Sequence, residues 1–379
     1  MGVEALQKRL FDQYSSSKPS TDCRKYAVNT PHRIKRFYYI HPMMAHLMKS
    51  SLGIGKRVLT AVIELVALLV FLYAFLLAAE YADKSAVLLQ AAGTSMGINQ
   101  NAFTQFFYFV KDVFTGNWGN VASSFSTLGG FSVVAVVGFS LPLTIFLLAI
   151  SLLISVPIVV LIGIGYSRRM NSTTRVASNL YVGLGIVFPL FLVGAFLRFF
   201  LYNSSLVISA PTTNLPYWTF PTHIPVIDGL IHGNYAMASA GILVFIIPLL
   251  LMVFFSSTSM LQIYRSGILK SLNQGYLEAA SSLGLPRWIV VRNYLMIKGS
   301  SELFRYISIV MTSILTFDIV VEAVMTYRGL GWAFYESILT GSYFGAIFTL
   351  FVFGILVIIS SFLSSIIRVI TDPEAVGGE

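Results

Sequence analysis

The sequence predicts an all-α membrane protein with six transmembrane helices and with both termini on the cytoplasmic side. Hydrophobic residues make up 56% of the 379-residue chain, charged residues only 11%, and the mean hydropathy is +0.78. Ordinary soluble domains are far less apolar than this. The apolar residues are gathered into long runs, and most basic residues lie between alternate runs. The chain is therefore expected to cross a membrane repeatedly.

Six apolar runs meet or approach the length of a membrane span. A hydrocarbon core about 30 Å thick requires roughly 20 apolar residues in a helix. Four prolines fall inside the second to fourth runs, where each can kink its helix because it lacks a backbone N–H: Pro142, Pro157, Pro189 and Pro248. The predicted spans are Val58–Ala79, Val133–Tyr166, Val176–Leu201, Ala236–Ser256, Leu303–Met325 and Phe344–Ile370.

The distribution of Lys and Arg sets the orientation. If both termini are cytoplasmic, the segments on that side hold nearly all the basic residues, and only Lys84, Lys111, Arg198 and Arg328 lie on or near the outer side. Positively charged loops stay inside, so this topology is favoured. The net charge of +9 is then explained by a basic inner face against anionic lipid, without a nucleic acid partner.

The segments between the spans divide the chain further. Residues 1–57 form a cytoplasmic N-terminal extension, either a short surface helix or a disordered tail. Residues 58–130 form an anchor helix with a first extracytoplasmic segment, whose phenylalanines predict a helix in the headgroup region. Residues 131–372 form a core with the other five spans, and 373–379 a cytoplasmic tail. Cys23 is the only cysteine, which excludes an internal disulfide.

The cytoplasmic segment from Arg265 to Arg292 is polar and permits helix formation between two apolar spans. Gly284 stands where a left-handed helix stop is expected, and Pro286 where a second helix begins. Ala279 and Ala280 leave little side-chain bulk, so another protein could approach this backbone closely. An ordinary amphipathic connector is the alternative.

Charged residues at membrane depth are few, and they are functional candidates because burying a charge in lipid is costly. They are Glu64, Asp318 and Glu322. Asp318 and Glu322 are four residues apart and share a helix face. Structural pairing, with Arg328 or a partner subunit, is favoured over proton transport.

The segment containing Glu278, Ala279, Ala280 and Gly284 resembles the EAA loop of binding-protein-dependent ABC importer permeases, and its longer context is similar to the dipeptide and oligopeptide subfamily. The resemblance continues in Glu322, in the Gly329-Leu330-Gly331 turn and in the Asp372-Pro373 pair, and covers roughly residues 54–375. Two features depart from the family pattern: Lys298-Gly299 replaces a Leu-Pro pair, and Arg328 replaces a proline.

The resemblance implies a type I ABC importer permease fold in the plasma membrane of a prokaryote. Its coupling loop, residues 259–302, would seat an EAA coupling helix in an ATPase through Glu278, Ala279, Ala280 and Gly284. Glu322, Gly329, Leu330 and Gly331 would belong to an outer turn or gate region. The implied partners are a second, homologous permease subunit, two ATP-binding subunits that carry ATP and Mg, and an extracytoplasmic solute-binding protein.

No catalytic, cofactor-binding or metal-binding residues are expected in this chain, which also lacks a phosphate-binding loop of its own. The substrate would be a peptide, or an oligosaccharide. A secondary transporter driven by an ion gradient is the alternative, although no clear inverted repeat is present. A membrane-embedded enzyme is a weaker alternative that would rely on His223 and His232 near Asp228.

Overall fold

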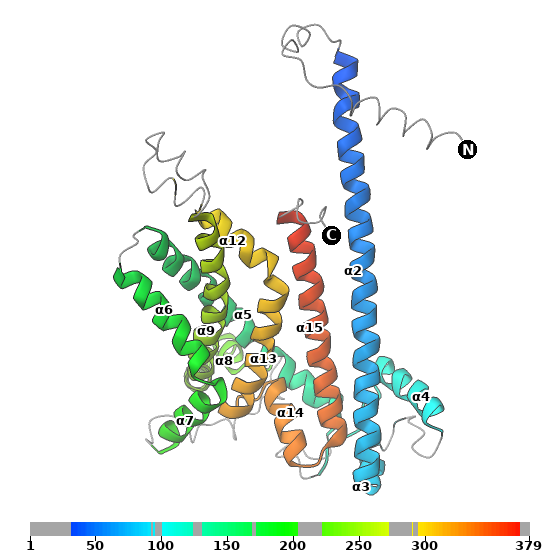
Figure 1. Cartoon of the computed structure of the whole chain (residues 1–379). Helices are drawn as coiled ribbons and strands as arrows, with labels where there is room; N and C mark the ends of the chain where they lie inside the picture. Colours follow the sequence, from blue (N-terminus) through cyan, green and yellow to red (C-terminus); the bar gives the residue numbers. More distant parts are fainter. Residues whose placement is uncertain are drawn as a thin grey trace, which may run out of the picture. The chain divides into compact units, whose positions relative to one another are not determined.

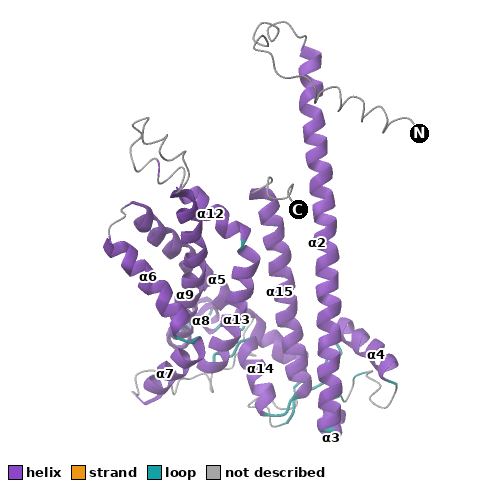
Figure 2. Cartoon of the chain, viewed as in Figure 1, coloured by secondary structure: helices purple, strands orange, loops and turns teal. Residues whose placement is uncertain are grey.

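The computed structural model describes residues 32–91, 94, 101–123, 131–168, 172–203, 222–272, 290 and 295–371. Contacts divide the chain into two units, Met1–Gly55 and Lys56–Glu379. Helix is the dominant structure of the described residues (Figure 2), and their only β pairing is an isolated bridge between Asn120 and Ser132. The all-α class predicted from composition is therefore confirmed for the described part of the chain.

Within the described residues, five helices are long and apolar enough to cross a membrane, and each overlaps a predicted span. Their membrane-spanning parts are Arg57–Ala82, Val133–Gly163, Tyr235–Lys270, Ile307–Met325 and Tyr343–Ile366. They belong to the helices α2 (His32–Ala82), α5 (Val133–Arg168), α9 (Tyr235–Leu272), α13 (Ile307–Met325) and α15 (Tyr343–Thr371). α2 continues upstream of the predicted span, and α5 and α9 remain helical through their internal prolines.

The third predicted span is broken into two helices, α6 (Ser172–Val187) and α7 (Leu190–Asn203), which meet at an angle of 86°. Pro189 lies at the break, where its missing N–H ends the hydrogen-bond ladder of α6. Counted together, the pair provides the sixth span. It leads from the end of the bundle at which α5 stops towards the end at which α14 (Leu330–Leu339) lies (Figure 1).

The fifth predicted span also differs from a single helix. Its first residues belong to α12 (Met296–Arg305), and α13 begins after a break at Tyr306. α12 is amphipathic, as expected for a helix at the edge of the bilayer.

Short helices lie between the spans. They are α3 (Lys84–Gln90), α4 (Ala102–Thr115), α8 (Pro225–Ile231) and α14. Figure 1 shows α3, α7 and α14 towards one end of the second unit and α12 towards the other. Segments expected on opposite sides of the membrane therefore lie at opposite ends of the bundle.

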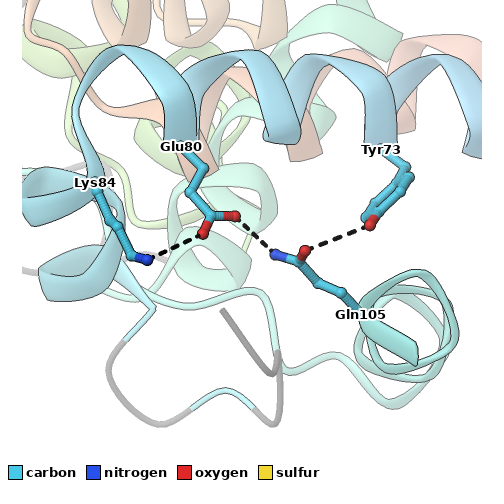
Figure 3. Close-up of polar contacts among 4 residues, drawn as sticks. All are labelled: Tyr73, Glu80, Lys84 and Gln105. Carbon is cyan, nitrogen blue, oxygen red and sulfur yellow. Dashed lines mark hydrogen bonds and ion pairs between the residues drawn. The ribbon is translucent and has the colours of Figure 1, made fainter. Parts of the chain in front are cut away.

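α4 is the phenylalanine-rich helix predicted for the first outer segment. Its buried face is fixed to α2 by polar contacts (Figure 3). The Gln105 side chain donates to Glu80 at 2.9 Å, and the Tyr73 hydroxyl donates to the Ala102 carbonyl at 2.5 Å. Lys84 lies 3.8 Å from Glu80. The opposite face of α4 leaves phenylalanine rings exposed, an arrangement suited to the headgroup region.

Two apolar clusters hold the second unit together. The first joins α2, α4, the start of α5, α14 and α15, and includes Trp118 stacked on Phe348 with centroids 5.0 Å apart. The second joins α5, α9 and α13 around Tyr264, Leu261 and Ile314, all of which are fully or almost fully buried. α13 carries Glu322, one of the predicted outer residues, and this second cluster fixes its position.

Candidate functional site

Glu322 lies in the last turn of α13 and is completely buried. One carboxylate oxygen accepts a hydrogen bond from the Thr144 hydroxyl at 2.8 Å, and the other accepts from the Gly331 backbone N–H at 2.6 Å. Thr144, from α5, in turn accepts a hydrogen bond from the Leu330 N–H at 2.8 Å. These four residues form the outer-turn site, which joins α5, α13 and the first turn of α14.

Gly331 of the outer-turn site and the adjacent Gly329 are required by the close packing there. A Cβ on Gly331 would lie 2.7 Å from the Ile319 carbonyl oxygen and 2.8 Å from its Cα. A Cβ on Gly329 would collide with the Glu322 carboxylate itself. The carboxylate therefore occupies the space that a side chain at position 329 would fill, and it accepts the Gly331 N–H in the first turn of α14.

The chain reverses between α13 and α14 through a left-handed residue, Thr326, with φ 52°. The Tyr327 N–H returns to the Glu322 carbonyl at 3.0 Å, which closes the end of α13. The Arg328 guanidinium, at the position where the family pattern has proline, lies 5.8 Å from the centroid of the Trp332 ring. This distance is within the range of a cation–π contact.

The structure thus brings together the four predicted outer residues, Glu322, Gly329, Leu330 and Gly331, and adds Thr144. Sequence reasoning missed Thr144 because it is one of several hydroxyl residues in an apolar span. A hydroxyl at that depth usually bonds to its own helix, as Thr144 also does with the Ser140 carbonyl at 3.4 Å. No local signal distinguishes it from its neighbours.

Asp318 lies one turn before Glu322 and is also completely buried. Neither of its carboxylate oxygens has a hydrogen-bond partner among the described residues. The pairing expected for this acid is therefore not found in the part of the chain that the structure describes. Because the side chain is enclosed within this chain, a partner subunit cannot reach it without rearrangement of the helices around it.

The predicted coupling residues Glu278, Ala279, Ala280 and Gly284 lie outside the described residues, as does Pro286. The structure does describe both ends of that segment. The Lys270 Nζ atom, near the end of α9, lies 2.9 Å from a carboxylate oxygen of Glu302 in α12. An ion pair therefore joins the two helices that flank the segment.

α9 is fixed to its neighbours one to two turns before the same loop. Arg265 donates to the Asn179 side chain at 2.5 Å and to the Ser178 carbonyl at 3.2 Å, which joins α9 to α6. The fully buried Tyr264 ring is wedged between glycines of α5 and α12: a Cβ on Gly163 would overlap the ring, and one on Gly299 would lie 2.9 Å from it. Gly299 is half of the Lys298-Gly299 departure from the family pattern, and this close approach gives its small size a physical reason.

The histidines that suggested an enzyme lie around α8. The Asp228 carboxylate accepts from the hydroxyl and the backbone N–H of Thr222, at 2.7 and 3.2 Å, while His232 contacts the Asp228 backbone carbonyl at 2.8 Å. The His223 ring packs edge-on against Phe139. Asp228, inside α8, thus fixes the turn that leads into this short helix, which gives the carboxylate a structural role.

Comparison with known proteins identifies the family. Residues 139–376 match the family described as "Binding-protein-dependent transport system inner membrane component". The matched region begins in α5, includes the outer-turn site and the segment between α9 and α12, and ends just after α15.

The curated proteins similar to the chain include three permeases of peptide transport systems. The "Probable D,D-dipeptide transport system permease protein DdpB" of Escherichia coli is 24% identical over 62% of this chain and 69% of its own length. The "Dipeptide transport system permease protein DppB" of Lactococcus lactis is 22% identical over 73% and 82%, respectively. The "Peptide transport system permease protein SapB" of Salmonella typhimurium is 23% identical over 62% and 73%. With its apolar spanning helices and the family match over more than half of its length, the chain belongs to the binding-protein-dependent transport system inner membrane components and is a multi-pass membrane protein.

Proposed function

We propose that this chain is one permease subunit of an ATP-driven importer, that it forms half of the translocation pathway, and that the cargo is a peptide. The observation that carries the proposal is the family match over residues 139–376, together with three relatives that are all named as peptide or dipeptide permeases. An oligosaccharide cargo is the alternative within the same family.

Energy enters through separate ATP-binding subunits in this proposal. The segment between α9 and α12 contacts an ATPase through Glu278, Ala279, Ala280 and Gly284, and ATP and Mg are bound by the ATPase. The described ends of this segment support a mechanical role, because the Lys270–Glu302 ion pair and the Tyr264 wedge hold α9 and α12 together. A push on the loop would therefore move α9, α12 and the following α13 as one body.

The outer-turn site responds to this movement at the other end of α13. Because Glu322 and Thr144 fix the Leu330 and Gly331 N–H groups, displacement of α13 relative to α5 either carries α14 along or breaks these hydrogen bonds. We propose that this site holds the outer gate in one of its two positions. The remaining partners are a second, homologous permease subunit and an extracytoplasmic solute-binding protein.

The test is isolation of the native complex through a tag on this chain, followed by identification of its companions. The purified complex is then placed in proteoliposomes, and uptake of a labelled tripeptide is measured with the copurified binding protein and internal ATP. ATP-dependent uptake is expected.

A secondary transporter is the second candidate, and the buried carboxyl pair of Asp318 and Glu322 is the observation that favours it. Uptake without ATP, in response to a proton or sodium gradient alone, would establish that function instead. A complex that contains no ATP-binding subunit would count equally against the importer.

A further inference from the structure

A pocket of about 760 Å³ lies between α7, α13 and α14, beside the outer-turn site. α7 contributes Phe191 and Phe199, α13 contributes Val320, and α14 contributes Phe334 and Ile338. The lining also includes Gly331, whose N–H donates to the Glu322 carboxylate. Binding sites for small molecules in proteins commonly have about 300–1,000 Å³ and mostly apolar walls with a few polar groups.

Among the described residues that line this pocket, Arg198 is the only charged one. Its side chain is exposed, and one guanidinium nitrogen donates to the Val324 carbonyl at the end of α13, at 2.7 Å. This bond fixes the guanidinium in place and uses one of its five N–H donors. Arginine can hold a carboxylate through two parallel hydrogen bonds. The pocket thus combines apolar walls with a fixed cation.

The exposed surface of α13 leads to the pocket. Thr312, Thr316, Val320 and Ala323 follow one another at spacings of three or four residues and share a helix face. Thr312 and Thr316 are exposed within a membrane-spanning helix, and Val320 and Ala323 line the pocket. Each threonine hydroxyl donates to its own helix, to the carbonyl four residues earlier, so its oxygen remains able to accept a further hydrogen bond. A hydroxyl-bearing face suits a polar, hydrated path better than lipid tails.

We propose that this pocket binds the C-terminal end of the transported peptide, with the terminal carboxylate on Arg198 and an apolar last side chain between the walls. The inference rests on the proposed function and extends it to a position on the path and a preferred substrate class. The pocket adjoins the outer-turn site. Substrate held against Gly331 and α14 would lie directly beside the hydrogen bonds that Glu322 and Thr144 make with that turn.

Two other roles for these residues lead to different results. Arg198 could serve only as a cap for the carbonyls at the end of α13, a position where a cation is favourable. Alternatively, an anionic lipid headgroup could occupy the pocket. The free carboxylate is the decisive chemical feature, because a peptide amide keeps every other group of the substrate and lacks only that charge.

The test uses the whole complex in proteoliposomes, supplied with saturating binding protein loaded with Ala-Ala-Phe or with the same peptide as its C-terminal amide. Binding-protein affinity for each peptide is measured separately, and it cancels between variants because that protein is unchanged. Arg198→Gln is expected to lower the uptake rate of the free acid by about tenfold, the factor that corresponds to about 1.4 kcal/mol, and to leave uptake of the amide unchanged. The uptake rate of the free acid by Arg198→Lys should lie between those of the wild type and Arg198→Gln. Lys111→Gln, which removes an exposed cation from α4, is the matched control.

A second variant tests the walls without changing charge. Ala195→Trp narrows the pocket from the α7 side and should slow uptake of Ala-Ala-Phe several-fold more than uptake of Ala-Ala-Ala. Equal losses for acid and amide in Arg198→Gln would assign Arg198 to capping and overturn the inference. The inference would also be overturned if Arg198→Gln left the ratio of acid uptake to amide uptake unchanged. This holds as well if the variant complex has lost bound anionic lipid in native mass spectrometry. If the wild-type complex imports neither peptide, the proposed function fails, and it does so before any variant is compared.

Discussion

The Glu322 carboxylate and the Gly331 backbone N–H, nine residues apart, form a buried hydrogen bond of 2.6 Å that ties the end of α13 to the start of α14. The second carboxylate oxygen is bound by Thr144 of α5, whose own hydroxyl oxygen accepts from the Leu330 N–H. An acid in a membrane span thus accepts a buried backbone N–H directly and orients the threonine hydroxyl that accepts a second one. This accounts for an ionisable residue at a depth where such residues are rare.

Gly331→Ala should destabilise the chain, because the added Cβ would meet the backbone of Ile319, which cannot move aside as a flexible side chain can. The expected cost is about 1–3 kcal/mol. It is measured as a lower thermal midpoint of the purified protein in detergent. Gly138→Ala in α5 is the control, since its Cβ would meet no atom within 4 Å; its midpoint should stay the same or rise slightly. Equal midpoints for the two variants would contradict the packing described for the turn.

Thr144→Val and Glu322→Gln should be coupled energetically. Thr144→Val removes a donor to Glu322 and an acceptor for Leu330 while keeping the shape of the side chain, and each buried group left unsatisfied costs about 1–3 kcal/mol. Glu322→Gln keeps one acceptor and should be milder. The double variant should lose less stability than the sum of the single losses, with a coupling of about 0.5–3 kcal/mol. Strict additivity in chemical or thermal unfolding would show that the two side chains do not interact.

Gly163→Ala should disturb the Tyr264 wedge, whereas Gly165→Ala, two residues away in α5, should not. A Cβ at position 163 would overlap the Tyr264 ring, while one at position 165 would meet nothing within 4 Å. The expected penalty for Gly163→Ala is about 1–3 kcal/mol, and the smaller side chain in Tyr264→Leu should relieve part of it in the double variant. A double variant less stable than either single variant would argue against this steric account.

Asp318→Leu should leave the chain as stable as the wild type or make it more stable. The carboxyl is fully buried, and its oxygens have no hydrogen-bond partner within the described ranges, so the substitution removes a desolvated polar group without breaking a hydrogen bond of those ranges. A buried polar group without a hydrogen-bond partner costs about 1–3 kcal/mol, so its replacement by an apolar side chain should be neutral or stabilising by up to that amount. Uptake should also persist. If Asp318→Leu is stable but transports nothing, Asp318 has a function in ion coupling, and the secondary-transport alternative gains weight.

The sequence predicted the class and the positions of the spans well, because long apolar runs have few structures open to them in a bilayer. It did not predict that Val176–Leu201 bends by 86°: Pro189 marked a possible kink, but the angle depends on the packing of α7 against α13. The break at Tyr306, which separates α12 from α13, carried no proline signal at all.

The residues of the candidate site could be predicted only where they belong to a recognisable family motif. Glu322 and the Gly329-Leu330-Gly331 turn were identified by resemblance, and the structure shows them in contact. Thr144 and Arg198 were not, since they lie more than a hundred residues from their partners in the sequence and depend on how the helices meet. The coupling role of Glu278, Ala279, Ala280 and Gly284 stays a prediction, because these residues lie outside the described ranges.

ATP-driven peptide uptake by the complex carrying Gly284→Pro tests the central claim most directly, since the claim is that ATPase subunits drive this chain through the segment between α9 and α12. Proline at position 284 would alter the helix stop expected there, and the described helices would be untouched. We expect the variant to insert in the membrane and to keep its partner permease, while ATP-driven uptake is lost and less ATPase copurifies. Uptake at the wild-type rate with a full complement of ATPase would contradict the account.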